Sequence, residues 1–165
     1  MTSVGITGHQ MRKGIDWQWV RREVRHVLGR FGRGDALWTC LANGADTIAA
    51  QEALASGMVV KAVIPHARYA DVFDEDDRVI YNDLIGQANE VVQIAPVEED
   101  EQAYLDAGLR VADLSDLMIV VWDGKPAAGK GGTGDIAAYA RDHGASVIWL
   151  DTQSSKVRDI SEAAL

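Results

Sequence analysis

The chain has 165 residues, which fits one packed domain, and its 47% of hydrophobic residues argues against a disordered protein. Its net charge of −9 argues against broad contact with nucleic-acid phosphates, so we expect no nucleic-acid partner. A small anion stays possible as a ligand, because backbone amides at a helix start bind phosphate without a basic surface.

Short β-rich segments alternate with helical segments along the whole chain. The continuous apolar run at 117–122 is typical of a strand buried on both faces, and it favours a parallel sheet with helices on each side. The predicted strands are Val4–Thr7, Ala36–Leu41, Met58–Ile64, Glu90–Ile94, Leu117–Trp122 and Ser146–Leu150.

The helical segments have recognisable ends. Asp16 can cap the first helix, which carries an apolar stripe as far as Phe31 and is expected to end at Gly32 or Gly34. The other predicted helices cover residues 46–54, 74–87, 99–114 and 133–142. This alternation predicts βαβ units, and therefore a single Rossmann-like, three-layer α/β/α domain with a mostly parallel sheet. We place the domain at residues 1–152 and a polar C-terminal tail at 153–165.

Ligands of open parallel sheets bind beyond the carboxyl ends of the strands. After the first predicted strand, Gly8 permits a tight turn, and His9 and Gln10 supply hydrogen-bonding side chains. His9 could instead cap a turn or pack at the sheet edge.

The loops after the second and third predicted strands are also candidates. Asn43 and Gly44 form a turn, and Asp46 either caps the next helix or caps it beside a ligand hydroxyl. Pro65 leads to Tyr69, whose ring could stack on a base, cover the core or make a dimer contact.

The strongest segment runs from Trp122 to Asp135 and is rich in glycine. The amides of Gly131, Gly132 and Thr133, which open a helix, are suited to cradle a phosphate. The spacing is neither that of a Walker loop nor that of a dinucleotide fingerprint, and a flexible surface loop is the alternative.

Two carboxylates, Asp123 and Asp135, flank this loop. Either could hold ribose hydroxyls, or act as a general base or nucleophile at a glycosidic carbon. Asp135 could instead complement the helix dipole.

Cys40 is the only cysteine, so there is no intrachain disulfide, and we expect it to be a buried hydrophobe. The histidines show no spacing of metal ligands, and we expect no metal and no cofactor. No apolar run approaches the roughly 18 residues of a membrane span, and no leader precedes the first strand, so we expect a cytoplasmic protein without a membrane partner.

Taken together, these loops resemble those of the SLOG superfamily, which includes the DNA-processing protein DprA and the Lonely-guy phosphoribohydrolases. The resemblance is carried by residues 4–9, 41–46, 63–65 with Tyr69, 121–124 and 131–135. It implies a Rossmann-like sheet, a nucleotide-derivative site between the first-strand loop and the glycine-rich loop, and a homodimer or higher homo-oligomer.

The Lonely-guy enzymes carry a PGGxGTxxE motif in which the terminal Glu is catalytic. When Gly132 and Thr133 are aligned with its Gly-Thr pair, Ile136 stands where that Glu belongs and Asp135 lies one residue earlier. Our leading expectation is therefore the binding or sensing of a nucleotide or nucleotide-derived small molecule. The alternatives are an N-glycosidic hydrolase acting on a nucleoside monophosphate or related compound, and a protein-interaction module with a purely structural glycine loop.

Overall fold

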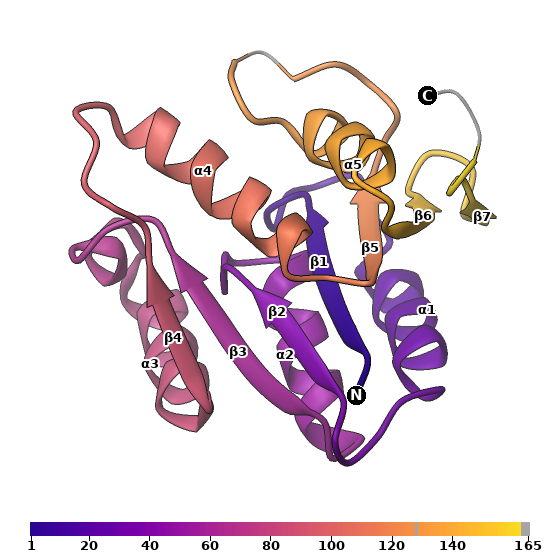
Figure 1. Ribbon diagram of the computed structural model, residues 1–165, viewed down its shortest axis with the longest axis horizontal. Coiled ribbons are helices and arrows are strands. Elements are labelled where there is room, and N and C mark those ends of the chain that lie inside the picture. Colours follow the sequence, from indigo (N-terminus) through magenta and orange to yellow (C-terminus); the bar gives the residue numbers. More distant parts are fainter. Residues whose placement is uncertain (128, 163–165) are drawn as a thin grey trace.

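The structure is a computed structural model that describes residues 1–127 and 129–162 (Figure 1). The strands are β1 (Ser3–Gly8), β2 (Ala36–Thr39), β3 (Val59–Ile64), β4 (Glu90–Gln93), β5 (Leu117–Trp122), β6 (Ser146–Asp151) and β7 (Lys156–Asp159). The helices are α1 (Trp17–Leu28), α2 (Ala45–Ala55), the 3-10 helix η1 (Tyr69–Val72), α3 (Glu75–Gln87), α4 (Asp100–Asp113) and α5 (Thr133–Asp142).

The strands form one sheet in the order β4-β3-β2-β1-β5-β6-β7. Strands β1 to β6 run parallel, and β7 pairs antiparallel with β6. The predicted α/β class and mostly parallel sheet are confirmed. The strand order reverses between β1 and β5, and at such a point the loops on the two sides diverge and leave room for a ligand.

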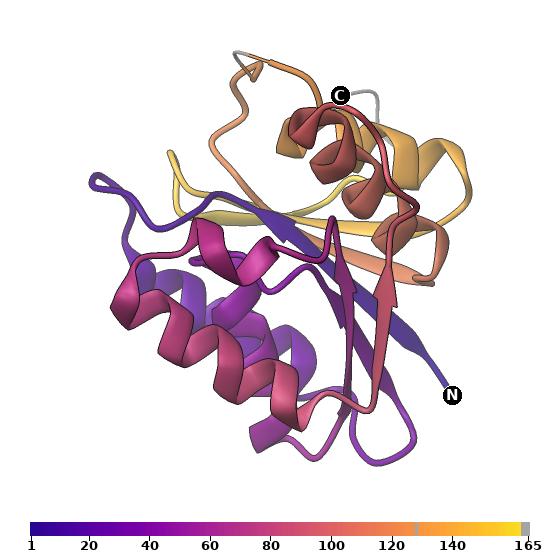
Figure 2. The same cartoon turned by 90° about the vertical axis from the view of Figure 1, so that its left-hand side faces the viewer.

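The helices cover both faces of the sheet, as Figure 2 shows with the sheet nearly edge-on. Helices α1, α2 and α3 pack on one face and α4 and α5 on the other, and each face has its own hydrophobic core. Residues Met118 to Val121 of β5 are fully buried between the two layers, as the continuous apolar run predicts.

Helix α1 is shorter than its apolar stripe suggests. It ends at Leu28 with Gly29 as its C-cap, whereas we expected the end at Gly32 or Gly34. Phe31 still packs against the core, but from the turn that follows the helix.

The segment after Asp151, which we expected to be a polar tail, contains strand β7. The side chains of Lys156 to Asp159 are all exposed, so no hydrophobic pattern marks this strand, and we did not predict it. Its backbone pairs with β6, and the next residue, Ile160, is buried in the core. Among the helices of the described residues, none has the length and apolar character needed to cross a bilayer.

Candidate ligand-binding site

A cavity of about 460 Å³ opens where β1, β2 and β3 end, beside the reversal of strand order. Helix η1 and the starts of α3 and α5 add to its walls, together with one side of α4. The predicted site residues that line it are Gly8, Gln10, Asn43, Asp46, Pro65, Tyr69, Gly131 and Thr133. The predicted residues that do not line it are His9, Gly44, Trp122, Gly132, Asp123 and Asp135.

The loops after β1 and β2 are bonded together at the rim of the cavity. The Met11 N–H donates to the Asn43 carbonyl at 3.1 Å, and the Ala45 N–H donates to the His9 carbonyl at 3.2 Å. Gly44 lies between these bonds with φ +117°, and a Cβ there would stand 2.6 Å from the Met11 nitrogen. Only glycine fits this close approach, so Gly44 shapes the rim by joining two backbones.

Helix α5 begins at the cavity with unpartnered backbone amides. Gly132 is its N-cap and supplies no capping side chain, while its carbonyl accepts from the amides of Asp135 and Ile136. Within the described chain, the N–H groups of Thr133 and Gly134 donate to no residue. These amides carry the positive end of the helix dipole, and Gly131 and Thr133 line the cavity beside them.

Aromatic rings form part of the cavity wall. Tyr69, Phe73 and Tyr104 line it, and we call these three residues the aromatic wall. The Tyr69 ring centroid lies 5.0 Å from that of Phe73 and 6.2 Å from that of Tyr104. Tyr81 packs edge-on against Tyr69 from α3, so the wall is supported from behind.

Asp46 does not cap α2, since the N-cap is Gly44 and Asp46 is the second residue of the helix. Its Oδ2 atom instead accepts a hydrogen bond from the Ala42 N–H at 3.3 Å, and the residue is 6% exposed. Burial raises the pKa of Asp46 to about 7, although hydrogen bonds from the loop lower it in part. A buried carboxyl group therefore lines the cavity and titrates close to neutral pH.

Asp74 and Asp77 bring two further carboxylates to the cavity. Asp74 is the N-cap of α3 and accepts from the Asp77 N–H at 2.9 Å, while Asp77 accepts from the Asn43 amide at 2.7 Å. The Asn43 side chain is thus bonded to α3, and the residue lines the cavity.

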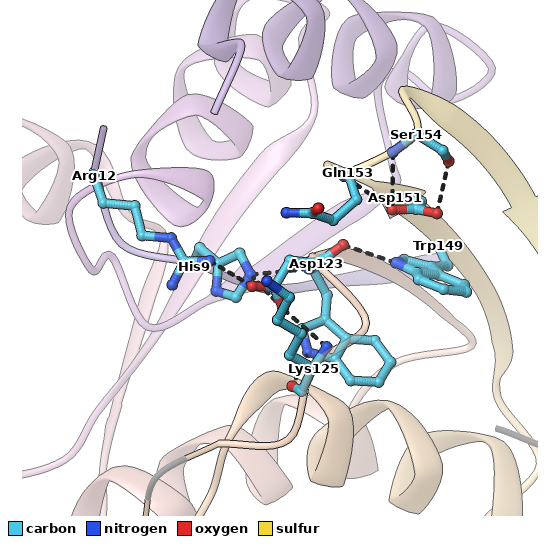
Figure 3. Close-up of polar contacts among 9 residues, drawn as sticks. His9, Arg12, Asp123, Lys125, Trp149, Asp151, Gln153 and Ser154 are labelled. Atoms are coloured by element: carbon cyan, nitrogen blue, oxygen red, sulfur yellow. Dashed lines mark hydrogen bonds and ion pairs between the residues drawn. The ribbon is translucent and has the colours of Figure 1, made fainter. Parts of the chain in front are cut away.

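His9 and Asp123 form a polar cluster with Arg12 beside the cavity (Figure 3). The Asp123 N–H donates to His9 Nε2 at 3.0 Å, and Arg12 Nη2 lies 2.8 Å from Asp123 Oδ2. Burial and the nearby Arg12 lower the pKa of His9, so its imidazole acts here as a neutral acceptor rather than as an ion-pair partner. Burial opposes ionisation of Asp123, but the Lys125 N–H, His9 and Arg12 together lower its pKa below the usual value.

Two further predicted residues, Trp122 and Asp135, lie near the start of α5 but do not line the cavity. Trp122 packs its ring on Gly134, and its indole N–H donates to the Lys125 carbonyl at 2.9 Å. Asp135 is exposed in the first turn, whereas Ile136 is buried and lines the cavity. The position that carries the Lonely-guy glutamate is thus apolar here and does face the cavity.

The described residues hold no group of three His, Cys, Asp or Glu side chains arranged to bind a metal ion. Of the residues that line the cavity, none is Lys, Arg or His within the part of the chain that the structure describes. Recognition of an anion in this cavity would therefore depend on backbone amides and the Thr133 hydroxyl group.

Solved structures of other proteins share the fold of this chain. DNA processing protein A from Helicobacter pylori matches with a TM-score of 0.64 and 18% identity, over 90% of this chain and 64% of that one. DprA from Streptococcus pneumoniae matches with a TM-score of 0.66 and 21% identity, over 90% of this chain and 50% of that one. TM1055, of the Lonely-guy family, matches with a TM-score of 0.58 and 14% identity, over 89% of this chain and 72% of that one.

This chain has the Rossmann-like fold that these structures share. The resemblance seen in the loop residues is thereby confirmed at the level of the fold. No family model matches the sequence, and no curated protein matches it. The chain spans between half and two thirds of the length of the two DprA structures, so it corresponds to one part of those proteins.

Our exclusion of a nucleic-acid partner is wrong. The Helicobacter pylori protein, which contains the same fold, binds single-stranded DNA. Net charge sums over the whole surface, whereas nucleic acid responds to the local charge at the site. Here Arg12, Lys13 and Lys125 are exposed on the loops that follow β1 and β5, despite the overall charge of −9.

Several residues that line the cavity were not predicted from the sequence. Phe73, Asp74 and Asp77 lie around the start of α3, where acidic residues indicate a helix N-terminus rather than a site. Tyr104 lies on α4, which precedes β5 and crosses to the other face of the sheet. A ring spaced along a helix gives no signal that it faces a cavity built by distant loops.

Proposed function

We propose that this chain binds a nucleotide, or a small molecule derived from one, in the cavity at the ends of β1, β2 and β3 and the start of α5. The observation that supports the proposal most is that unpartnered amides at the start of α5 and the aromatic wall border one cavity. Its volume of about 460 Å³ is in the usual range of about 300–1,000 Å³ for small-molecule sites.

The proposed orientation of the ligand follows from the chemistry of the start of α5 and of the aromatic wall. A phosphate group lies against Gly131 and Thr133, where the dipole of α5 favours an anion. The base lies against the aromatic wall, whose rings offer flat apolar faces. Gln10 and Asn43 also line the cavity and supply hydrogen bonds for ribose hydroxyl groups.

Isothermal titration calorimetry with adenine and guanine mononucleotides, ADP-ribose and a short oligothymidylate tests this proposal. The oligonucleotide is included because a protein with the same fold binds single-stranded DNA. Binding of one of these compounds in a one-to-one complex supports the proposal. If none binds at millimolar concentration, the glycine loop is purely structural and a protein-interaction module becomes the better explanation.

A matched pair of variants tests whether the phosphate group of the ligand lies at Thr133. Thr133→Val removes a hydroxyl group at the proposed phosphate position and keeps the shape of the side chain. The lost hydrogen bond to a charged group would weaken binding by roughly 1.5–3 kcal/mol, or about ten- to a hundredfold. Thr152→Val is the control, because the Thr152 hydroxyl is buried without a partner in the described chain and lies outside the cavity.

An N-glycosidic hydrolase is the second candidate function. The observation that favours it is Asp46, a buried carboxyl group in the cavity whose pKa, raised to about 7 by burial, suits a general acid. Asp123 and Asp135, the carboxylates we predicted for this role, do not line the cavity. Release of free base from a nucleotide, lost in Asp46→Asn and retained in Asp135→Asn, would support the hydrolase with Asp46 as its acid.

A further inference from the structure

The cavity has an uneven distribution of charge. Its described lining includes the carboxyl groups of Asp46, Asp74 and Asp77 and no basic side chain. The positive potential comes from helix N-termini: α5 begins at the cavity, and α2 and α3 begin beside Asp46 and Asp74. An anionic ligand that enters therefore meets carboxyl groups whose charge no cation in the wall offsets.

Asp46 differs from the other two carboxyl groups in its burial. It is 6% exposed, whereas Asp74 and Asp77 lie near the exposed start of α3. The described chain gives Asp46 no ion-pair partner. Because a buried and unpaired carboxylate is costly, the group is stabilised in its protonated form.

The described lining residues around Asp46 include no cationic side chain, so its charge is offset only by the start of α2 and by hydrogen bonds such as that from the Ala42 N–H. Cys40, at the end of β2, and Tyr69, on η1, are uncharged at neutral pH, because burial raises the pKa of both groups. Helix α3 contributes Asp74 and Asp77, and α4 contributes the Tyr104 phenol, whose pKa is also raised by burial. The lining residues from β1 and α5 carry no titratable group.

We infer that Asp46 meets the ligand as an uncharged carboxylic acid, so that binding in the cavity is coupled to the uptake of a proton. This inference rests on the proposed function, because it concerns the same cavity. An uncharged Asp46 can donate a hydrogen bond to an acceptor on the ligand, whereas an ionised Asp46 repels an anionic ligand across a medium of low dielectric constant.

The coupling predicts how affinity depends on pH. Only protein molecules in which Asp46 is protonated are competent to bind. The apparent dissociation constant is therefore the intrinsic value divided by the fraction of molecules in that state. With the pKa of Asp46 at about 7, the apparent dissociation constant rises roughly 25-fold between pH 6.5 and pH 8.5.

Calorimetry with AMP tests the inference on the wild-type chain and on Asp46→Asn, which is neutral at every pH and nearly the same shape. Titrations at pH 7.5 in HEPES and in Tris, which differ in ionisation enthalpy and contain no phosphate, give the number of protons taken up on binding. The AMP phosphate titrates in the same way for both proteins, so only the difference between them reports on Asp46. Asp83→Asn is the control, because it removes one carboxylate from α3 outside the cavity.

We expect the wild-type chain and Asp83→Asn to take up most of a proton when AMP binds. Asp46→Asn should take up close to none, and its apparent dissociation constant should no longer rise with pH as that of the wild-type chain does. Equal proton uptake and parallel pH profiles in all three proteins would overturn the inference while leaving the proposed function intact. If AMP and the other compounds of the panel fail to bind, the proposed function fails and the inference falls with it. If Asp46→Asn does not fold, the wild-type titrations decide, because the absence of proton uptake contradicts the inference.

Discussion

The Nε2 atom of His9 accepts a hydrogen bond of 3.0 Å from the backbone N–H of Asp123, and this contact joins the loops that follow β1 and β5. These strands flank the reversal of strand order, so the contact lies where the sheet opens toward the candidate site. A second bond holds the loops together, because the His9 N–H donates to the Val121 carbonyl at 3.0 Å. His9 thus joins the turn after β1 to the end of β5 and to Asp123, where the loop toward α5 begins (Figure 3).

The bond requires His9 Nε2 to be unprotonated. Burial and Arg12 lower the pKa of His9, so the neutral ring with its proton on Nδ1 is expected at pH 7.5. Because the folded state prefers the neutral ring, its contribution to stability is complete above the unfolded pKa and is lost as the pH falls through the folded pKa. Two-bond ¹H–¹⁵N spectra of the histidine rings report the tautomer, and a proton on Nε2 at pH 7.5 would contradict this geometry.

Gly44→Ala should destabilise the protein strongly. A Cβ at this position has an unfavourable φ of +117° and also stands 2.6 Å from the Met11 nitrogen. We expect a loss of about 3 kcal/mol or more in the free energy of unfolding. The matched variant is Gly34→Ala, where φ is +95° but nothing lies within 4 Å, so only the conformational cost of about 1–2 kcal/mol should appear. Equal losses in urea denaturation would show that the two loops at the rim do not meet as described.

Glu101→Ala should loosen the glycine-rich loop without much effect on stability. Glu101 Oε1 accepts from the Lys130 N–H at 2.7 Å and anchors the loop to α4. The bond is exposed, so the free energy of unfolding should change by less than about 1 kcal/mol. Hydrogen exchange at residues 129–131 should become faster, whereas Glu98→Ala, which removes an exposed carboxylate two residues before α4, should leave it unchanged. Unchanged exchange in Glu101→Ala would mean that the loop is held by other contacts.

Asp46→Asn should stabilise the ligand-free protein, and the gain should grow with pH. Burial raises the pKa of Asp46 to about 7 in the folded state, above its ordinary value of 3.8. The stability of the wild-type chain that depends on this group is therefore complete below about pH 4 and is lost as the pH rises to about 7. The difference between variant and wild type should increase by roughly 2–4 kcal/mol over that window. A constant difference between pH 4.5 and pH 7.5 in chemical denaturation would show that Asp46 is not buried as an unpaired acid.

The sequence predicts the sheet well because strands buried on both faces appear in it as continuous apolar runs. The apolar run from Leu117 to Trp122 and the glycines after the strands both indicate a parallel sheet with loops at one edge. Strand β7 has no such run, because its four side chains are exposed and its pairing with β6 uses only the backbone. Strands of this kind are recognised only once their partner is in place.

The candidate site was predicted in part for a related reason. Gly8, Gly131 and Thr133 could be chosen because strand ends and helix starts are defined by local sequence, and they do line one cavity. Whether a side chain next to them faces the cavity depends on small rotations of the chain that the sequence does not specify. Asp135 is exposed and Ile136 lines the cavity, although they are adjacent residues of α5 separated by a turn of about 100°.

The measurement that tests the proposed site most directly is a ¹H–¹⁵N titration of the backbone amides with AMP. The account predicts that the largest shifts occur at Thr133 and Gly134, whose amides have no partner in the described chain, with further shifts at Gly8 and Gly131. The amides of α1 and β7, which lie away from the cavity, should not move. Saturable shifts confined to those distant elements, with Thr133 and Gly134 unchanged, would contradict the account.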